Sequence, residues 1–397
     1  MRHAMAGTLL LAALLGANIA FGANLAGAED LAVPVAYLRQ EVERPPVLSD
    51  LDPVPGDEGV QGARLGLSDD ATTGRFLGHD YTLSEVDVPV GGDLLSAARE
   101  ALAGSRLLLI DAPAADLLRV ADLPEAQGAL LLNVGAPDDS LRDGDCRANV
   151  LHALPSLAMR ADALSQFLLV RRWTEVALLA GPFAGDQAWA QALRDSATKF
   201  GLSLEDDRPW DFQGDLGRSA QSEIPLLTQD FAEHDVLLVA DETGDFGRYV
   251  LFNTWEPRPV GGSEGIVPVA WSPVLENWGA SQLQSRFADQ AGRPMRPKDY
   301  AAWTALRAIG EAVTRTGSND PAALRSYMLS PDFELDGFKG RPLSFRDWDG
   351  QLRQPIAIVQ PRAMIAMAPF EEFLHQSNEL DTLGRDRPES ACRAFAP

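Results

Sequence analysis

The segment that most constrains the fold runs from Glu175 to Gly201, where an apolar run, a loop with Gly and Pro, and an amphipathic helix follow one another. The run EVALLA is short and continuous, which is typical of a strand buried on both faces of a parallel sheet. Asp186 is positioned as the N-cap of the helix, and Trp189 and Leu193 recur on one helical face. The segment therefore predicts a β-loop-α unit, which needs neighbouring parallel strands to bury it.

The same alternation recurs along most of the chain. Further strands are predicted at 81–88, 106–113, 128–137, 235–242 and 265–271, and further helices at 59–67, 93–104, 114–120, 159–170 and 299–317. Residues 338–360 predict two strands around the turn DWDG, and residues 361–397 predict no element. Alternating strands and helices over 397 residues predict a doubly wound α/β fold, whose ligands gather at the carboxyl ends of the strands.

The N-terminal residues have the order of an export signal. One arginine, Arg2, precedes an apolar run, and small residues at Ala26 and Ala28 follow it. This order predicts a signal peptide cleaved after Ala28 and a periplasmic protein with no membrane span after signal removal. A membrane anchor is the alternative, but residues 8–21 are short for a span and Asn18 interrupts them.

The charge of the chain excludes nucleic acid as a favoured partner. With 34 Lys and Arg against 57 Asp and Glu, the formal net charge is −23, which repels phosphate. Acidic residues gather at 138–145, 205–211 and 241–245, and such clusters can hold a hard cation such as calcium or a lanthanide. None has the spacing of a calcium loop, and carboxylates gather on the solvated loops of any acidic protein, so a metal site stays open. DWDG is interpreted as a hairpin turn rather than a metal loop.

The two cysteines, Cys146 and Cys392, lie far apart in the sequence. In an oxidising compartment, an even pair predicts one disulfide that joins the C-terminal tail to the body of the protein. Two free buried thiols are the alternative, because sequence spacing does not establish the required geometry.

The familiar catalytic motifs are absent from the sequence. None of the 5 histidines is paired with another at metal-ligand spacing, and there is no Walker loop, no G-x-S-x-G elbow and no G-x-G-x-x-G after a strand. These absences favour a binding protein over an enzyme, and they predict no cofactor.

Four segments, in order, resemble the type I periplasmic solute-binding proteins of ABC transporters, in the branched-chain amino-acid-binding branch. The family's G-x-x-x-A helix resembles GVQGARLGL, and its F-R-x-x-P-x-D segment resembles NVLHALPSLAMRADALSQFL. Its helix entry K-V-A-L-I-Y-x-x-x-x-Y-G-x-G resembles EVALLAGPFAGDQAWAQAL, and its A-Y-D-A helix resembles DYAAWTALRAIGEAV. The resemblance covers most of the chain after the signal. Within the family, the sequence looks most like the subgroup associated with PQQ-dependent alcohol dehydrogenase systems.

The resemblance implies two doubly wound lobes of the type I periplasmic binding protein fold, joined by three hinge crossings near 151–156, 269–273 and 329–337. It implies a signal peptide at 1–28, lobe 1 at 29–152 plus 273–329, lobe 2 at 153–272 plus 330–360, and a C-terminal tail at 361–397. A small-molecule ligand would bind between the lobes, and lobe closure would present a shape that an ABC permease recognises. A quinoprotein alcohol dehydrogenase system is a further possible partner of the subgroup.

The ligand-binding positions of the family match two groups of residues. In lobe 1 they match Asp111, Ala112 and Pro113, and then Ala136, Asp138, Asp139 and Ser140. In lobe 2 they match the ligand-packing aromatic at Phe183, then Asp186, the acid Asp241 or Glu242 that would meet an ammonium group, and Trp271, which would close over the cleft. The alternative roles are an N-cap for Asp186 and ordinary packing for Phe183 and Trp271.

The acids in the first-lobe loops bear on the choice of ligand. Amino-acid binders of the family have small hydroxyl residues where this chain has Asp111, Asp138 and Asp139, and unpaired carboxylates repel a ligand carboxylate. A cation, a cationic metal complex or an amine-bearing solute therefore fits these loops better. PQQ, a multiply charged anion, would need Arg39, Arg142 or Arg160 in the cleft. Three functions remain open: a transport-linked binding protein, an accessory or sensor protein that binds a metal ion, PQQ or a partner protein, and an enzyme.

Overall fold

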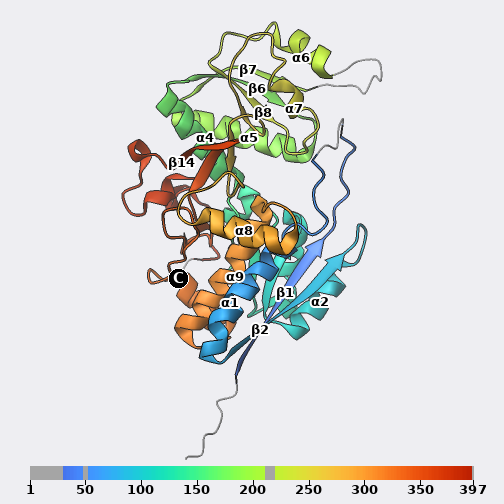
Figure 1. The fold of residues 1–397 in the computed structure, drawn as a ribbon, viewed down its shortest axis with the longest axis vertical. Coiled ribbons are helices and arrows are strands. Elements are labelled where there is room, and N and C mark those ends of the chain that lie inside the picture. Colours follow the sequence, from blue (N-terminus) through green and yellow to red (C-terminus); the bar gives the residue numbers. More distant parts are fainter. Residues whose placement is uncertain (1–29, 48–51, 211–219, 396–397) are drawn as a thin grey trace, which may run out of the picture.

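The computed structural model describes residues 30–47, 52–210 and 220–395, and in this part of the chain two α/β lobes stack along the long axis of the molecule (Figure 1). The predicted signal peptide and its cleavage site lie outside the described residues. Within them, no helix has both the length and the apolar character needed to cross a membrane.

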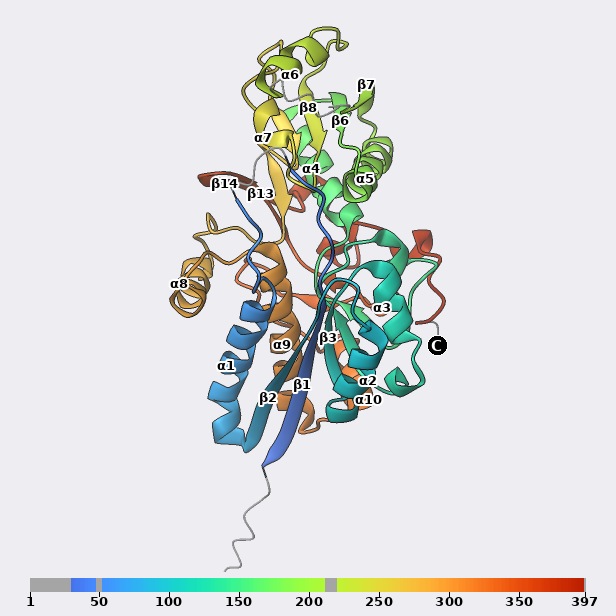
Figure 2. The ribbon, with the colours of Figure 1, turned by 90° about the vertical axis from the view of Figure 1, so that its right-hand side faces the viewer.

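The first lobe is built on a parallel sheet. Among the described residues its five strands are ordered β2-β1-β3-β4-β5, so β2 is an outer edge. The strands are β1 (Leu31–Gln40), β2 (His79–Val88), β3 (Leu107–Asp111), β4 (Leu130–Asn133) and β5 (Val150–His152). One face packs against α1 (Val60–Leu77), α9 (Pro297–Thr316) and α10 (Pro321–Met328), and the other against α2 (Leu94–Gly104) and α3 (Ala114–Ala121) (Figure 2). Alternate residues of the strands serve the two faces, and β3 and β4 are buried throughout, as the continuous apolar runs predict.

The second lobe repeats this arrangement with a parallel sheet that is ordered β7-β6-β8-β9 in the described residues. Its strands are β6 (Glu175–Ala180), β7 (Ser203–Pro209), β8 (Val236–Ala240) and β9 (Val260–Gly262). One face packs against α4 (Leu157–Arg171) and α5 (Ala184–Phe200), and the other packs with α7 (Gly247–Val250) and residues of α6 (Ala220–Thr228).

The segments between the lobes form smaller sheets. An antiparallel sheet of β10 (Val267–Val269), β13 (Ile356–Gln360) and β14 (Ala363–Ala368) packs on α4 and, by its other face, near α8 (Ala280–Ala291) and α9. A hairpin of β11 (Ser344–Phe345) and β12 (Leu352–Arg353) lies around DWDG, so the predicted hairpin is confirmed. The hairpin residues Phe345 and Leu352 belong to the core of the first lobe, together with Phe333.

The predicted helices and the strands of the two parallel sheets are confirmed, most of them within a few residues of their ends, with four corrections. The helix predicted at 59–67 continues to Leu77 as α1. Asp186 is not the N-cap of α5, because the helix begins one turn earlier, after Phe183. The acidic residues 205–207 lie in β7, an edge strand whose solvent-facing side chains give no apolar pattern, and not in a loop; Asp211 lies outside the described residues. The strand predicted at 265–271 forms β10 and pairs antiparallel with β13, not within a parallel sheet. The elements β5, β7, β9, β14, α6, α7, α8 and α10 were not predicted. Most of them are short or lack an apolar pattern, but α8 has 12 residues and a buried face of Ala280, Leu283 and Phe287 that was recognisable in the sequence.

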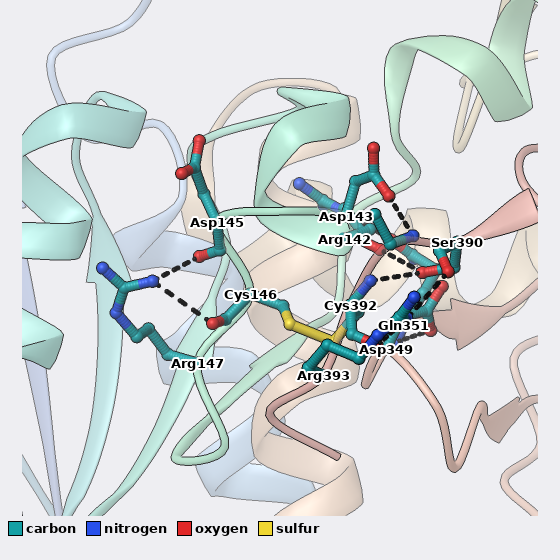
Figure 3. The surroundings of a disulfide bond; sticks show 11 residues. Arg142, Asp143, Asp145, Cys146, Arg147, Asp349, Gln351, Ser390, Cys392 and Arg393 are labelled. Atoms are coloured by element: carbon teal, nitrogen blue, oxygen red, sulfur yellow. Dashed lines mark hydrogen bonds between the residues drawn. A yellow bond between two sulfur atoms is a disulfide. The ribbon is translucent and has the colours of Figure 1, made fainter. Parts of the chain in front are cut away.

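The predicted disulfide between Cys146 and Cys392 is confirmed (Figure 3). Their Cα atoms lie 5.7 Å apart, and 246 positions separate them in the sequence. The bond therefore fixes the C-terminal segment to the loop that follows β4.

Small residues allow α1 and α9 to pack closely. A Cβ atom built on Gly62 would lie 1.8 Å from the carbonyl oxygen of Asp299, and one on Gly66 would lie 2.7 Å from Cβ of Leu306. The two helices are therefore closer than any side chain at these positions would permit.

Asp70, on α1, is buried against α9 and forms an ion pair with Arg307. Burial raises the pKa of the Asp70 carboxyl to about 7, although Arg307 opposes the shift. A carboxyl with a raised pKa favours the folded state while it is protonated, so its contribution is lost as the pH rises from about 4 to about 7.

In the unmodified protein, Asp70 should therefore cause the free energy of unfolding to fall by at most about 4 kcal/mol between pH 4 and pH 7. We expect Asp70→Asn to remove this fall. Urea unfolding at several pH values measures this slope. Asp289→Asn, an exposed change on α8, is the control that should leave it unchanged. An identical slope in Asp70→Asn and the unmodified protein would contradict the assignment.

Candidate functional site

A cavity of about 490 Å³ lies at the carboxyl ends of β1, β3 and β4. The segment between β1 and α1 supplies much of its wall, and Figure 2 shows this segment, in blue, extending toward the second lobe. Five of the residues predicted to bind ligand line the cavity together: Asp111, Ala112, Pro113, Ala136 and Asp138. Their convergence follows from the parallel sheet, because the loops after adjacent strands meet at one edge.

Asp111 is paired rather than free to repel a ligand. Its Oδ1 accepts a hydrogen bond from Nζ of Lys298 at 2.9 Å, and its Oδ2 accepts one from the hydroxyl of Tyr37 at 3.2 Å. Burial, and then the charge of Asp111, raise the pKa of Tyr37 well above its ordinary value, so Tyr37 remains a donor. The sequence-based premise that Asp111 is unpaired is wrong, because α9 brings Lys298 to the strand end from far along the chain.

Cations line the same cavity, although sequence reasoning had named only Arg39 among them. Arg39 is the second-to-last residue of β1 and is in register with Asp87 on β2 and Asp111 on β3. Its Nε lies 2.7 Å from Oδ1 of Asp87. Lys298 and the exposed Arg44 also line the cavity. The position of Lys298, directly before the helix predicted at 299–317, is the one signal that could have drawn attention to it.

Two carboxylates of the cavity remain available to a ligand. Among the described residues, no group donates a hydrogen bond to the side chain of Glu58 or Asp138, and both are partly buried in the cavity wall. Burial raises the pKa of Glu58, and the charge of Lys298 opposes this shift. The cavity thus presents acids beside the cations Lys298 and Arg44, an arrangement that can hold a ligand bearing an amine and an anionic group.

Arg142 supports the cavity wall from behind instead of reaching into the cleft. Its guanidinium donates to the carbonyl oxygens of Ala136 and Asp138, each at 2.9 Å, and to that of Leu154 at 3.2 Å. It also donates to Oε1 of Gln351 at 2.8 Å. Burial lowers the pKa of Arg142 to about 10, so the group stays charged at neutral pH. This one side chain joins the cavity wall to the first passage of the chain between the lobes.

Two further predicted residues of the first lobe lie outside the cavity. The carboxylate of Asp139 accepts hydrogen bonds from the backbone N–H of Ala158, at 3.1 and 3.2 Å, at the start of α4. Burial raises its pKa. Ser140 is exposed in the turn that follows. Asp139 therefore stabilises a helix terminus, and neither residue faces the cavity.

In the second lobe, two of the predicted acids already accept hydrogen bonds from backbone N–H groups. Asp186 is buried and accepts hydrogen bonds from the backbone N–H and hydroxyl of Thr243, each at 3.1 Å, and from the N–H of Phe183 at 3.2 Å. Burial raises its pKa. Asp241 accepts hydrogen bonds from three backbone N–H groups at the start of α7, of which that of Gly247 is the shortest at 2.6 Å. These carboxylates hold the loops after β6 and β8 in place.

Glu242 is the more exposed acid of the pair considered for a ligand ammonium, and it is also paired. It forms two hydrogen bonds with Arg160, at 2.7 and 3.0 Å, and accepts a third from Ser263 at 3.0 Å. Burial raises the pKa of Glu242, but Arg160 outweighs that effect and holds it below its ordinary value. Arg160 itself lies over the ring of Trp189, at 4.5 Å.

The two predicted aromatics have different environments. Phe183 is partly exposed at the start of α5. Trp271 is buried and stacks on Tyr300, with ring centroids 4.8 Å apart, and its Nε1 donates to Gln284 at 3.3 Å. Trp271 thus packs beside α8 and α9. None of the predicted second-lobe residues lines the first-lobe cavity.

A larger cavity, of about 770 Å³, lies between the C-terminal segment and residues 329–353 and contains no predicted ligand residue. Charged groups in it are paired with one another, Arg353 with Asp381 and Arg387 with Asp347, and Nε2 of His375 lies 3.4 Å from Oδ2 of Asp386. Because few of its charges are left for a ligand, the smaller cavity is the better candidate site.

The described residues contain no group of three or more His, Cys, Asp or Glu side chains arranged to hold a metal ion. In DWDG, Oδ1 of Asp349 accepts a hydrogen bond from the backbone N–H of Gln351 at 2.9 Å, and Gly350 adopts a φ of 71°. This geometry is that of a tight turn, which favours Gly at positive φ.

No protein-family model and no curated protein matches the sequence. The structure is similar to a branched-chain amino-acid ABC transporter periplasmic ligand-binding protein from Burkholderia xenovorans, with a TM-score of 0.69, 16% identity, and coverage of 92% of this chain and 100% of that chain. It is similar to a leucine-, isoleucine-, valine-, threonine- and alanine-binding protein from Brucella ovis in a closed conformation, with a TM-score of 0.65, 14% identity and coverage of 87% and 95%. It is also similar to an ABC transporter substrate-binding protein from Desulfitobacterium hafniense in complex with Leu, with a TM-score of 0.62, 15% identity, and coverage of 85% of this chain and 99% of that chain. The chain therefore has the type I periplasmic binding protein fold.

Proposed function

We propose that this chain, with the type I periplasmic binding protein fold, is the substrate-binding component of an ABC-type transport system and not an enzyme. The observation that carries the proposal is the cavity at the carboxyl ends of the first-lobe strands, where five residues expected to contact ligand converge. The similar solved structures, which are described as transporter binding proteins, support it. An exported, periplasmic protein with its signal removed after Ala28 and an ABC permease as partner are parts of the same proposal.

The proposed ligand contacts are the cavity residues Asp111, Ala112, Pro113, Ala136 and Asp138, to which we add Glu58 and Lys298. From the second lobe we retain Phe183 and Glu242, which closure would bring toward the ligand. The proposed lobes are 29–152 plus 273–329 and 153–272 plus 330–360, with a tail at 361–397. The core contacts of Phe333 and Phe345 favour assigning the segment before β13 to the first lobe instead.

The ligand is proposed to be a small amine-bearing solute. Its ammonium group would meet Glu58 or Asp138, because these carboxylates have no other hydrogen-bond donor in the described residues. Lys298 and Arg44 would accommodate an anionic group on the same solute. An amino acid, with its ammonium and carboxylate groups, therefore fits the cavity better than the acidic loop sequences suggest. A link to PQQ-dependent alcohol oxidation remains part of the proposal and rests on sequence resemblance alone. An accessory or sensor protein that binds a metal ion, PQQ or a partner protein is the second candidate.

Thermal unfolding of residues 29–397 with a panel of solutes tests this function. The panel contains amino acids, diamines, small alcohols and acids, PQQ, calcium and a lanthanide. An amine-bearing solute at about a hundred times its dissociation constant should add about 2.7 kcal/mol and raise the melting temperature. A shift with metals or PQQ alone would favour the accessory function over transport of an amine.

The variant Glu58→Gln sharpens the test. It should weaken binding of the amine by about tenfold to a hundredfold, through loss of a charge-assisted hydrogen bond. Stability without ligand should not fall, because burial raises the pKa of Glu58 and disfavours its ionised form. Glu100→Gln, an exposed change on α2, is the matched control. Equal affinities in the two variants would exclude Glu58 from the site.

A further inference from the structure

We propose that residues 370–392, called the strap below, form a fourth connection between the lobes and limit how far they separate. The strap follows β14 and leads to Cys392, so it comes after the passages of the chain that build the two lobes. The inference goes beyond the proposed function and needs no ligand. It rests on contacts that the strap makes with both lobes.

One end of the strap is anchored to the second lobe at Gly384. Its N–H donates to Oδ2 of Asp162 at 2.8 Å, and its carbonyl oxygen accepts from Nζ of Lys199 at 2.7 Å. Lys199 also donates to the same Asp162 oxygen, at 2.8 Å, so the three groups close a ring of hydrogen bonds. Asp162 lies on α4 and Lys199 on α5, which places this anchor on the helical face of the second lobe.

Gly384 suits this anchor because it has a φ of +81°, and a Cβ atom there would lie 2.8 Å from Cγ of Met159 on α4. Two contacts nearby extend the attachment. The N–H of Phe370 donates to Oε1 of Gln166, and Nε2 of Gln166 donates to the hydroxyl of Thr382, each at 3.2 Å. From Phe370 to Gly384, the strap therefore runs along α4.

The other end is anchored to the first lobe at the loop after β4 (Figure 3). Cys392 forms the disulfide with Cys146, and the hydroxyl of Ser390 donates to the carbonyl oxygen of Arg142 at 3.2 Å. Asp143 accepts a hydrogen bond from Arg385 at 2.9 Å and another from the backbone N–H of Ala391. This loop also carries the Arg142 side chain, which holds the wall of the proposed ligand cavity.

On both sides of Gly384, the strap is also bound to the hairpin after residue 343. Arg346 is buried and donates to Asp381 at 2.9 Å, to the carbonyl oxygen of Leu383 at 2.7 Å and to that of Arg385 at 3.0 Å. The chain from Gly384 to Cys392 extends to at most about 29 Å, so separation of the two anchors beyond that length requires one of them to break.

If the strap limits the separation of the lobes, the release of either anchor should have the same effect. We therefore compare three variants with the unmodified protein. The double change Cys146→Ser and Cys392→Ser releases the first anchor, Lys199→Met releases the second, and the third variant combines all three changes. Small-angle X-ray scattering measures the spread of lobe separations, and hydrogen exchange measures protection of the amides of Gly384 and Ala391. Each release should broaden the lobe separation and speed exchange at both amides by at least about tenfold, and the combination should add nothing further.

Several outcomes would overturn the proposal. Additive effects, or loss of protection only at the released end, would mean that each anchor stabilises its own lobe alone. Lys199→Arg keeps a cation beside Asp162 and should retain protection at both amides. If the serine variant fails to fold, reduction of the unmodified protein with dithiothreitol releases the same anchor, and unchanged scattering would then refute the strap. A failed ligand panel would leave these measurements unaffected, because they contain no ligand.

Discussion

Gly62→Ala should lower the free energy of unfolding by about 2 kcal/mol, although alanine is the better helix former by up to about 1 kcal/mol. The added Cβ would lie 1.8 Å from the carbonyl oxygen of Asp299 on α9, and a backbone atom cannot move aside as a flexible side chain can. The helices must separate, and the apolar core between them, including Ala301 and Ala305, loses contact. Urea unfolding monitored by circular dichroism measures the difference.

Gly104→Ala is the matched control for this change. Gly104 ends α2, and nothing lies within 4 Å of a Cβ built there. The added methyl group should leave stability unchanged or raise it by up to about 1 kcal/mol, because alanine restricts the unfolded chain. If the two alanine variants unfold at the same urea concentration, the close approach of α1 and α9 does not matter for stability.

Arg142→Leu should cost about 3–5 kcal/mol of stability, because it removes one member of a fully buried polar network. The carbonyl oxygens of Ala136, Asp138 and Leu154 and the amide oxygen of Gln351 would each lose a donor. Two of these carbonyls belong to the cavity wall, so ligand affinity should fall as well. Urea unfolding and the solute panel measure the two effects separately.

Arg119→Leu provides the comparison for Arg142. Arg119 forms an ion pair with Asp116 on an exposed helix surface, where such pairs contribute about 0–1 kcal/mol. The loss of stability in Arg142→Lys should lie between the losses in Arg142→Leu and Arg119→Leu, because lysine retains the charge but cannot reach four acceptors in fixed directions. A loss in Arg142→Leu no greater than that in Arg119→Leu would show that the cavity wall does not depend on this guanidinium.

The fold was largely predictable from the sequence because its signals are local. Buried parallel strands such as EVALLA are continuous apolar runs, and long helices such as α9 have a clear period. Most of the elements that escaped prediction have weak local patterns. Of these, β9 is short, and the solvent-facing edge strand β7 carries three consecutive acids, Glu205, Asp206 and Asp207, in place of an apolar pattern.

The candidate site was predictable only in part, because its chemistry depends on contacts between distant segments. The position of Asp111 at the end of β3 follows from the strand pattern, but its ion pair with Lys298 arises from tertiary packing across 187 positions. For the same reason, the backbone partners of Asp241 were not predictable from the sequence, whereas hydrogen bonding of Asp186 to backbone N–H groups at a helix terminus was one of its two predicted roles. A carboxylate at the end of a strand is a site candidate, and its partners decide whether it is available to a ligand.

The outer edge strands also bear on how copies of this protein meet. β2 carries the exposed acids Asp80, Glu85 and Asp87, and β7 carries Glu205, Asp206 and Asp207. Glu85 and Asp87 pair with Arg64 and Arg39, and Asp206 and Asp207 pair with Arg208 and Arg194, so both edges carry charges of both signs. A second molecule that extended either sheet would have to place its strand about 5 Å from these charged side chains, and charges on an edge strand oppose such pairing. Each sheet therefore ends in a border that opposes the growth of intermolecular β-structure, and the protein can be abundant without its unpaired backbone groups seeding aggregates.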